Sequence, residues 1–121
     1  MIIFLSGSIN SGKTTIAGLL KKQFPRSAHI EVDTIHDMYD WMPLEDAIPL
    51  NLKNALSLTQ NFIEEKIDVI ITYPLSRDEY EYFNKTLPLE IQRFFFTLNP
   101  RLDHALANRG TRELSEWEIE R

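Results

Sequence analysis

Apolar residues follow two alternating patterns along the chain, short continuous runs and longer stripes with helical spacing. The continuous runs predict buried strands, and they cover residues 1–5, 28–33, 67–73 and 91–98. The stripes between them predict helices over residues 13–24, 46–66, 76–85 and 100–109. Strands that alternate with helices predict an α/β fold, in which a doubly wound parallel sheet of four strands forms the middle of three layers.

Turn and capping residues set the expected boundaries of these elements. Pro25 closes the first helix, and Asp46 and Pro49 mark the start of the second. Capping boxes at residues 76–79 and 115–118 predict two further helix starts. Residues 34–41 have helical spacing over a length too short to assign.

The loop after the first strand carries the most specific motif. Gly7-Ser8-Ile9-Asn10-Ser11-Gly12-Lys13-Thr14 fits the phosphate-binding pattern G-x-x-x-x-G-K-[ST] at every fixed position. Its backbone N–H groups and the start of the following helix favour an anion. In this motif Lys13 reaches the β- and γ-phosphates of ATP, and the Thr14 hydroxyl is a ligand of Mg²⁺. The alternative is a Gly/Ser turn that binds nothing. The expected nucleotide-binding residues are Gly7, Ser8, Asn10, Ser11, Gly12, Lys13, Thr14 and Thr15.

Two carboxylates, Glu31 and Asp33, close the second predicted strand. Alternation along a strand turns both toward the same side. Beside a magnesium–nucleotide site, one carboxylate can hold the metal with Thr14, and the other can accept a proton from an attacking hydroxyl. We expect Glu31 and Asp33 both to be metal-site residues with Thr14, and one of the two carboxylates to be this base. The alternative is an exposed strand end followed by an acidic helix cap.

Two arginines flank a glycine in Arg109-Gly110-Thr111-Arg112. Arginine forks match phosphate oxygens, so residues 109–115 are expected to form a lid in which Arg109 and Arg112 stabilise the transferred phosphate. The alternative is a helix C-terminus with Gly110 as its C′ residue.

The segment after Asp33 contains further polar and aromatic candidates. His36 and Asp37 could contact a substrate, although the histidines of the chain lack metal-ligand spacing. Tyr39, Trp41 and Met42 could form the floor of an acceptor pocket or a patch for helix packing.

Composition excludes several classes of function. The chain has 121 residues, which suits one domain, and its formal net charge of −5 argues against a broad nucleic-acid surface. No apolar segment is long enough to span a membrane, and the chain begins without a signal-peptide pattern. The absence of cysteine excludes disulfides and thiolate zinc sites. These features predict a cytoplasmic protein.

The order of these motifs resembles that of the small P-loop kinases, the group of shikimate kinase, gluconate kinase and chloramphenicol phosphotransferase. Residues 32–38, Val-Asp-Thr-Ile-His-Asp-Met, are most similar to the segment after the second strand in chloramphenicol phosphotransferase-like proteins. The resemblance implies P-loop NTPase topology and a substrate-activating base at Asp33. It also implies an adenine contact for Arg109 and a phosphate contact for Arg112.

Two departures from that group matter. The third strand ends in Ile-Ile-Thr-Tyr, without the aspartate that the group often carries there. The chain also ends before the fifth strand and final helix of the group, which would leave the fourth strand as an exposed edge open to self-association. The expected function is transfer of the γ-phosphoryl group of ATP to a hydroxyl of a small molecule. The alternatives are a nucleotide-binding module without turnover and an NTPase.

Overall fold

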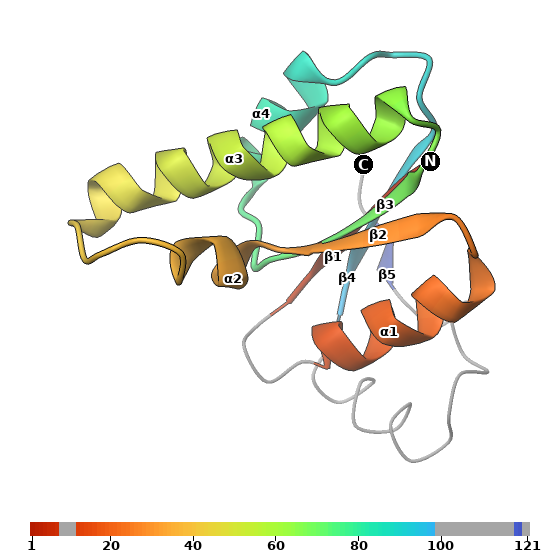
Figure 1. Ribbon diagram of the computed structural model, residues 1–121, viewed down its shortest axis with the longest axis horizontal. Coiled ribbons are helices and arrows are strands. Elements are labelled where there is room, and N and C mark those ends of the chain that lie inside the picture. Colours follow the sequence, from red (N-terminus) through yellow and green to blue (C-terminus); the bar gives the residue numbers. More distant parts are fainter. Residues whose placement is uncertain (8–11, 99–117, 120–121) are drawn as a thin grey trace.

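The computed structural model describes residues 1–7, 12–98 and 118–119. Its strands and helices alternate along the chain for most of its length (Figure 1). In chain order they are β1 (Ile2–Ser6), α1 (Lys13–Gln23), β2 (Ser27–Glu31), α2 (Val32–His36), α3 (Leu44–Glu64), β3 (Asp68–Thr72), α4 (Arg77–Thr86), β4 (Arg93–Thr97) and β5 (Glu118–Ile119).

The sheet has the strand order β2-β3-β1-β4-β5, with β1 in its centre. The pairs β2–β3, β3–β1 and β1–β4 are parallel, as expected from strands that alternate with helices. The four strands expected from the apolar runs are therefore confirmed, as is the α/β class. Parallel strands place their carboxyl ends at one edge of the sheet, where ligands bind in such folds.

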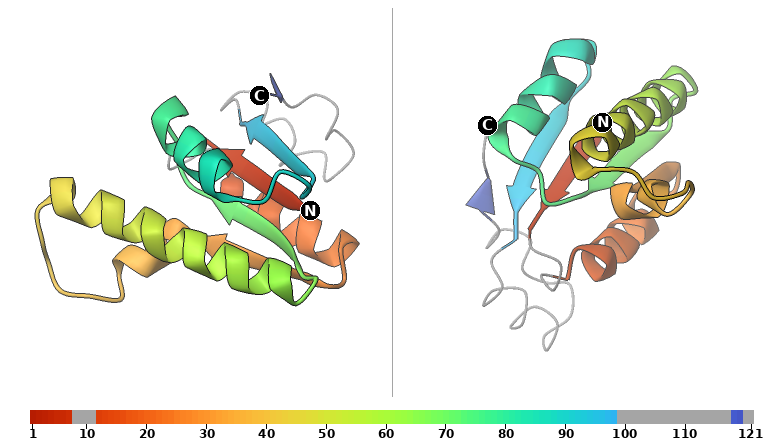
Figure 2. Two further views of the ribbon diagram at one scale, coloured as in Figure 1. Left: turned by 90° about the horizontal axis from the view of Figure 1, so that it is seen from above. Right: turned by 90° about the vertical axis from the view of Figure 1, so that its left-hand side faces the viewer.

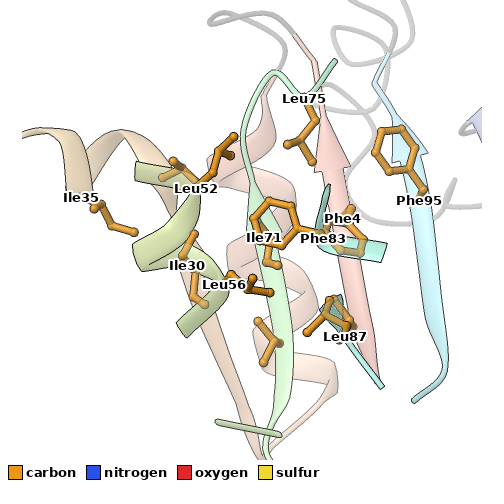
Figure 3. Packing of buried hydrophobic residues seen from close by; sticks show 14 residues of the cluster. Phe4, Ile30, Ile35, Leu52, Leu56, Ile71, Leu75, Phe83, Leu87 and Phe95 are labelled. Carbon is orange, nitrogen blue, oxygen red and sulfur yellow. The ribbon is translucent and has the colours of Figure 1, made fainter. Parts of the chain in front are cut away.

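Buried side chains on the two faces of the sheet form separate clusters. Along β1, Ile2 and Phe4 belong to one cluster and Ile3 and Leu5 to the other, because successive strand residues face opposite ways. Helix α1 contributes to the cluster around Leu5, whereas α3 and α4 cover the opposite face (Figure 2). Figure 3 shows that opposite cluster, with side chains from β1, β2, β3, β4, α3 and α4.

The start of α3 differs from the expected one. The helix begins at Leu44, after Pro43, whose carbonyl accepts hydrogen bonds of 2.9 Å from the N–H groups of Asp46 and Ala47. Pro49 is therefore inside the helix and does not mark its start. A proline lacks the N–H that a helix residue donates, so Pro49 carries a local cost. The helix has 21 residues and packs one side against the buried cluster, and this packing outweighs that cost.

The last described residues also differ from the expectation. Glu118 was expected to lie in a capped helix, but Glu118 and Ile119 form strand β5, antiparallel to β4 at Thr97 and Phe96. β5 thus pairs with the outer edge of β4 at these two positions. The unpaired backbone groups of an edge strand favour the addition of another strand in this way. Self-association through this edge stays a prediction.

One expected boundary is confirmed in full. Helix α4 begins with the predicted capping box: the N–H of Glu79 donates to Ser76 Oγ at 3.2 Å, and the N–H of Ser76 donates to Glu79 Oε1 at 2.8 Å.

Among the helices that the structure describes, none combines the length and apolar character needed to cross a bilayer.

Candidate functional site

The loop between β1 and α1 ends in a conformation that favours glycine. Gly12 precedes the first residue of α1 with φ 85°, in the left-handed region, and its carbonyl accepts the N–H of Ile16 at 3.0 Å. The helix therefore starts at the position that the motif predicts, with its N-terminus toward the loop. Ser8, Asn10 and Ser11 of the motif lie outside the described residues.

Lys13 turns back toward Gly7, the first residue of the motif. Its Nζ donates to the carbonyl of Gly7 at 2.7 Å, and the residue is only 8% exposed. A buried lysine needs hydrogen-bond acceptors, and here the first residue of the motif supplies one. The ammonium group is therefore held next to Gly7, at the start of the motif whose backbone N–H groups are expected to face phosphate.

Thr14 links α1 to the end of β2. Its hydroxyl donates to Glu31 Oε1 at 2.6 Å, a short hydrogen bond to a carboxylate. The two side chains face a pocket of about 160 Å³. The pocket is lined by Gly12, Lys13, Thr14, Thr15, Glu31 and Asp33.

Asp33 lines this pocket from a helix and not from the expected strand. It was placed on a strand, but β2 stops at Glu31 and Asp33 lies in the first turn of α2. The turn forms because the Thr34 hydroxyl donates to the carbonyl of Glu31 at 2.7 Å, while Val32 is fully buried. The argument from strand alternation is therefore wrong, yet both carboxylates line the same pocket.

Thr72 occupies the end of β3, next to both Leu5 and Glu31 in the sheet register. It is 1% exposed, and its Oγ1 lies 2.8 Å from Nε2 of His29 on β2. Burial lowers the pKa of His29, and Lys21 lowers it further, whereas the charge of Glu31 raises it. Thr72, hydrogen-bonded to His29, thus stands beside Glu31 at the end of β3, where the sequence lacks an aspartate.

Ser6 makes a contact with Leu75 that was not expected from the sequence. Buried at the end of β1, its Oγ donates to the carbonyl of Leu75 at 3.3 Å and accepts the N–H of Leu75 at 3.0 Å. These bonds tie the start of the phosphate loop to the segment between β3 and α4. Because the bonded residues are 69 positions apart, no local pattern could indicate them.

The segment after α2 is anchored to α3 by a polar cluster. The Tyr39 hydroxyl donates to Asn51 Oδ1 at 2.5 Å, and Asn51 Nδ2 lies 3.0 Å from His36 Nδ1. Asn51 is 3% exposed, so the cluster satisfies a buried amide. Trp41 is 87% exposed, which contradicts the packing alternative for this residue. Neither His36 nor Asp37 lines the pocket of Lys13, Thr14, Glu31 and Asp33.

The pocket residues fit a magnesium–nucleotide complex better than a resident metal. Within the described residues, no group of three or more His, Asp or Glu side chains is placed to hold a metal ion. Mg²⁺ keeps several waters and is bound through one or two carboxylates together with substrate phosphates. Thr14, Glu31 and Asp33 supply that kind of donor set. The predicted lid residues Arg109 and Arg112 lie outside the described residues.

Comparisons with known proteins identify the fold but no family. No family model matches the sequence. No curated protein matches it either. Among solved structures, it is similar to a chain of the "Structure of Pnkp1/Rnl/Hen1 complex", with a TM-score of 0.60 and 17% sequence identity. The match covers 95% of this chain but only 42% of that chain. At this identity the similarity shows a shared α/β fold with a parallel sheet.

Proposed function

We propose that this protein is an ATP- and Mg²⁺-dependent phosphotransferase that moves the γ-phosphoryl group to a hydroxyl of a small molecule. The observation that carries the proposal is the convergence of Lys13, Thr14, Glu31 and Asp33 on one pocket after a complete phosphate-binding motif. The pocket lies beside Gly12 at the N-terminus of α1, where both the backbone and the helix dipole favour an anion. The proposed fold is a doubly wound, three-layer P-loop kinase domain.

Lys13 and Thr14 are proposed to bind the triphosphate and its metal. The Lys13 ammonium, already turned toward Gly7, contacts the β- and γ-phosphates. The bond from Thr14 to Glu31 presents the hydroxyl oxygen and a carboxylate side by side, as a metal with phosphate and water ligands requires. Glu31 on β2 is thereby proposed to help hold the metal. In the small P-loop kinases that the chain resembles, an aspartate at the end of the third strand often does this.

Asp33 is proposed to orient and deprotonate the acceptor hydroxyl. Its side chain is exposed in the first turn of α2 and lines the phosphate pocket, so a hydroxyl can approach it from solvent. Phosphoryl transfer depends chiefly on positioning and on charge stabilisation. Arg109 and Arg112 are proposed to supply part of that charge stabilisation above the phosphates.

One observation favours a second candidate, a nucleotide-binding module without turnover. Thr72, a neutral residue, stands at the end of β3. If Glu31 does not replace the missing acid, nucleotide would bind without transfer. An NTPase differs from both, because its ATP consumption needs no added acceptor.

The Asp33→Asn and Lys13→Ala variants test the proposal together. Asn keeps the shape of Asp33 but cannot accept the proton, so phosphate transfer to an added alcohol should fall about 100-fold or more. ATP–Mg²⁺ should still raise the melting temperature of this variant. Lys13→Ala should abolish that ATP-induced stabilisation, because the ammonium contact with the phosphates is lost. Melting curves and transfer of labelled γ-phosphate provide the two measurements.

Matched controls separate these effects from general charge loss. Asp40→Asn and Lys22→Ala remove the same charges at exposed positions outside the pocket, and both variants should behave as the wild type. Unchanged transfer by Asp33→Asn would show that this carboxylate is not the base. Unchanged ATP stabilisation of Lys13→Ala would contradict the phosphate site itself.

A further inference from the structure

Helix α2, which carries Asp33, is too short to set its own orientation. It spans five residues, whereas isolated helices shorter than about 12 residues are marginal in water. Its last turn is closed by the N–H of Asp37, which donates to the carbonyl of Asp33 at 3.3 Å, and by the N–H of Met38, which donates to the carbonyl of Ile35 at 3.1 Å. The direction in which Asp33 points therefore depends on what α2 packs against.

Helix α3 supplies that packing. The chain turns back between α2 and α3, and the two helices lie side by side (Figures 1 and 2). Val32 and Ile35 of α2 are buried in the same cluster as Leu52 of α3, and Figure 3 shows Ile35 with Leu52. Apolar burial has no preferred direction, so these contacts hold α2 against α3 without fixing its rotation.

A buried amide on α3 adds direction to this contact. Asn51 is 3% exposed and lies one helical turn from Ala47 and from Ala55, both fully buried. Its Oδ1 accepts from the Tyr39 hydroxyl at 2.5 Å, and its Nδ2 lies 3.0 Å from Nδ1 of His36, the last residue of α2. An amide nitrogen only donates, so His36 Nδ1 accepts and the proton of the neutral ring is on Nε2.

Tyr39 contacts both helices from the segment that joins them. Its hydroxyl lies 3.3 Å from His36 Nδ1 and 3.5 Å from the carbonyl of Ala47. Its ring meets the His36 ring edge-on, with 5.6 Å between the centroids and 75° between the planes. Hydrogen bonds weaken steeply when their angle departs from linearity, so this cluster of His36, Tyr39 and Asn51 restricts the rotation of α2 on α3.

The cluster lies close to the proposed base along α2. His36 follows Asp33 by three residues, a spacing at which side chains are neighbours on a helix surface. The other carboxylate of the pocket, Glu31, is on β2 and bonded to Thr14 of α1. A rotation of α2 would therefore move Asp33 relative to Glu31 and Thr14.

Tyr73 gives a second sign that the cluster and the base are near each other. This residue follows β3, and its N–H donates to the carbonyl of Leu5 at 3.2 Å. Burial raises its pKa, and the negative charges that Glu79, Asp33 and Tyr39 carry when ionised raise it further. Asp33 and Tyr39 thus act electrostatically on the same side chain at the edge of the sheet.

We infer that Asn51 is a positioning residue for the proposed base: by bonding to His36 and Tyr39, it fixes the rotation of α2 at which Asp33 lines the pocket of Lys13 and Thr14. This inference rests on the proposed function and gives a part in it to a buried side chain outside the pocket.

The alternative is that Asn51 serves stability alone. Burying an amide removes its hydrogen bonds to water, and apolar carbon at the same position between two alanines would pack without that cost. A paired amide instead favours one arrangement of the two helices over others that pack equally well. The burial and full pairing of Asn51 are therefore better explained by a positioning role.

Amide hydrogen exchange on the full chain tests the fixation of α2 without any acceptor. The matched pair is His36→Asn and His36→Leu, since both side chains are smaller than His but only Asn keeps an oxygen that can accept from Asn51. In His36→Leu the N–H groups of Asp37 and Met38 should exchange about tenfold faster than in His36→Asn, because a buried donor loses its acceptor. Asn51→Ala should have the same effect. Asn54→Ala, at an exposed position of α3, should match the wild type.

Transfer of labelled γ-phosphate from ATP to glycerol then tests whether the fixation acts through Asp33. His36→Leu should lower kcat about tenfold or more relative to His36→Asn, because a small displacement of a catalytic group costs that much. Both variants should bind ATP–Mg²⁺ equally in melting curves. In the Asp33→Asn background, His36→Leu should lower transfer no further, since the group that it positions is already lost.

These measurements separate failure of the inference from failure of the proposed function. Equal exchange at residues 37 and 38 in the two His36 variants would overturn the inference whatever the activity. Faster exchange with undiminished transfer, or a full additional loss in the Asp33→Asn background, would overturn the positioning role. A wild type that binds ATP–Mg²⁺ but phosphorylates no alcohol would contradict the proposed function and, with it, the role of Asp33 as the positioned base.

Discussion

At the scale of single residues, the polar side chains near the phosphate pocket are held by partners from other elements. Lys13 bonds to Gly7, Thr14 to Glu31, and His29 lies beside Thr72. Each contact holds a side chain in one rotamer, so ligand binding does not have to order that side chain. The side chains that line the pocket are therefore held in place before any ligand binds.

His29 makes stability depend on pH. Its folded pKa is lowered by burial from the ordinary value of 6.5, with a further lowering by Lys21 and an opposing effect of Glu31. Below 6.5 the unfolded chain takes up a proton that the folded protein resists, so stability is full above this pH and is lost as pH falls toward the folded pKa. In His29→Gln, which cannot titrate, the free energy of unfolding should fall less between about pH 7 and about pH 5. Urea denaturation at several pH values measures this, and an identical slope in both proteins would exclude His29 as its source.

At the scale of elements, the short segment between β3 and α4 makes hydrogen bonds to two other elements, β1 and α4. It bonds to the end of β1 through Leu75, and it caps α4 through Ser76. The cap fixes where α4 starts, and with it the position of Tyr82 on that helix.

Ser76→Ala tests the contribution of this cap. Loss of an N-cap side chain costs about 1 kcal/mol, so the urea midpoint should fall accordingly. Ser57→Ala, at an exposed position inside α3, is the matched control and should be neutral or slightly stabilising because Ala is the better helix former. Equal midpoints for Ser76→Ala and the wild type would mean that the cap adds nothing to stability.

At the scale of the whole molecule, β1 joins the two faces of the sheet. Phe4 is fully buried at the centre of the larger cluster, with ring centroids 5.2 Å from Tyr80 and 5.6 Å from Phe83. The opposite face of the same strand packs against α1, which carries Lys13 and Thr14. The placement of the phosphate pocket thus depends on both clusters.

Phe4→Ala should destabilise the fold by about 3–5 kcal/mol, since it removes a buried ring and leaves a cavity. That loss is large against a total stability of about 5–15 kcal/mol for a typical domain. Leu58→Ala, at a position that is 37% exposed, should change stability far less. Calorimetric melting measures both, and a small effect of Phe4→Ala would show that the cluster can repack around the gap.

The sequence by itself determined the four parallel strands, helices α1, α3 and α4, and the part of the pocket formed by residues 12–15. Continuous apolar runs indicated four parallel strands, because strands buried on both faces leave no polar alternation. The phosphate-binding motif identified Lys13 and Thr14, since its residues are adjacent in the chain and their chemistry is local. The capping box of α4 was equally local and was confirmed.

Only the tertiary structure decided what depends on contacts between distant segments. It placed Asp33 in a helix turn and not on a strand, started α3 before Pro49, and bonded Ser6 to Leu75. It also formed a groove between α3 and α4, whose walls come from residues about 30 positions apart. The groove is lined by Pro49, Leu52, Lys53, Asp78, Glu79 and Tyr82. These features follow from packing and long-range hydrogen bonds, which outweigh local propensity and leave no periodic signal in the sequence.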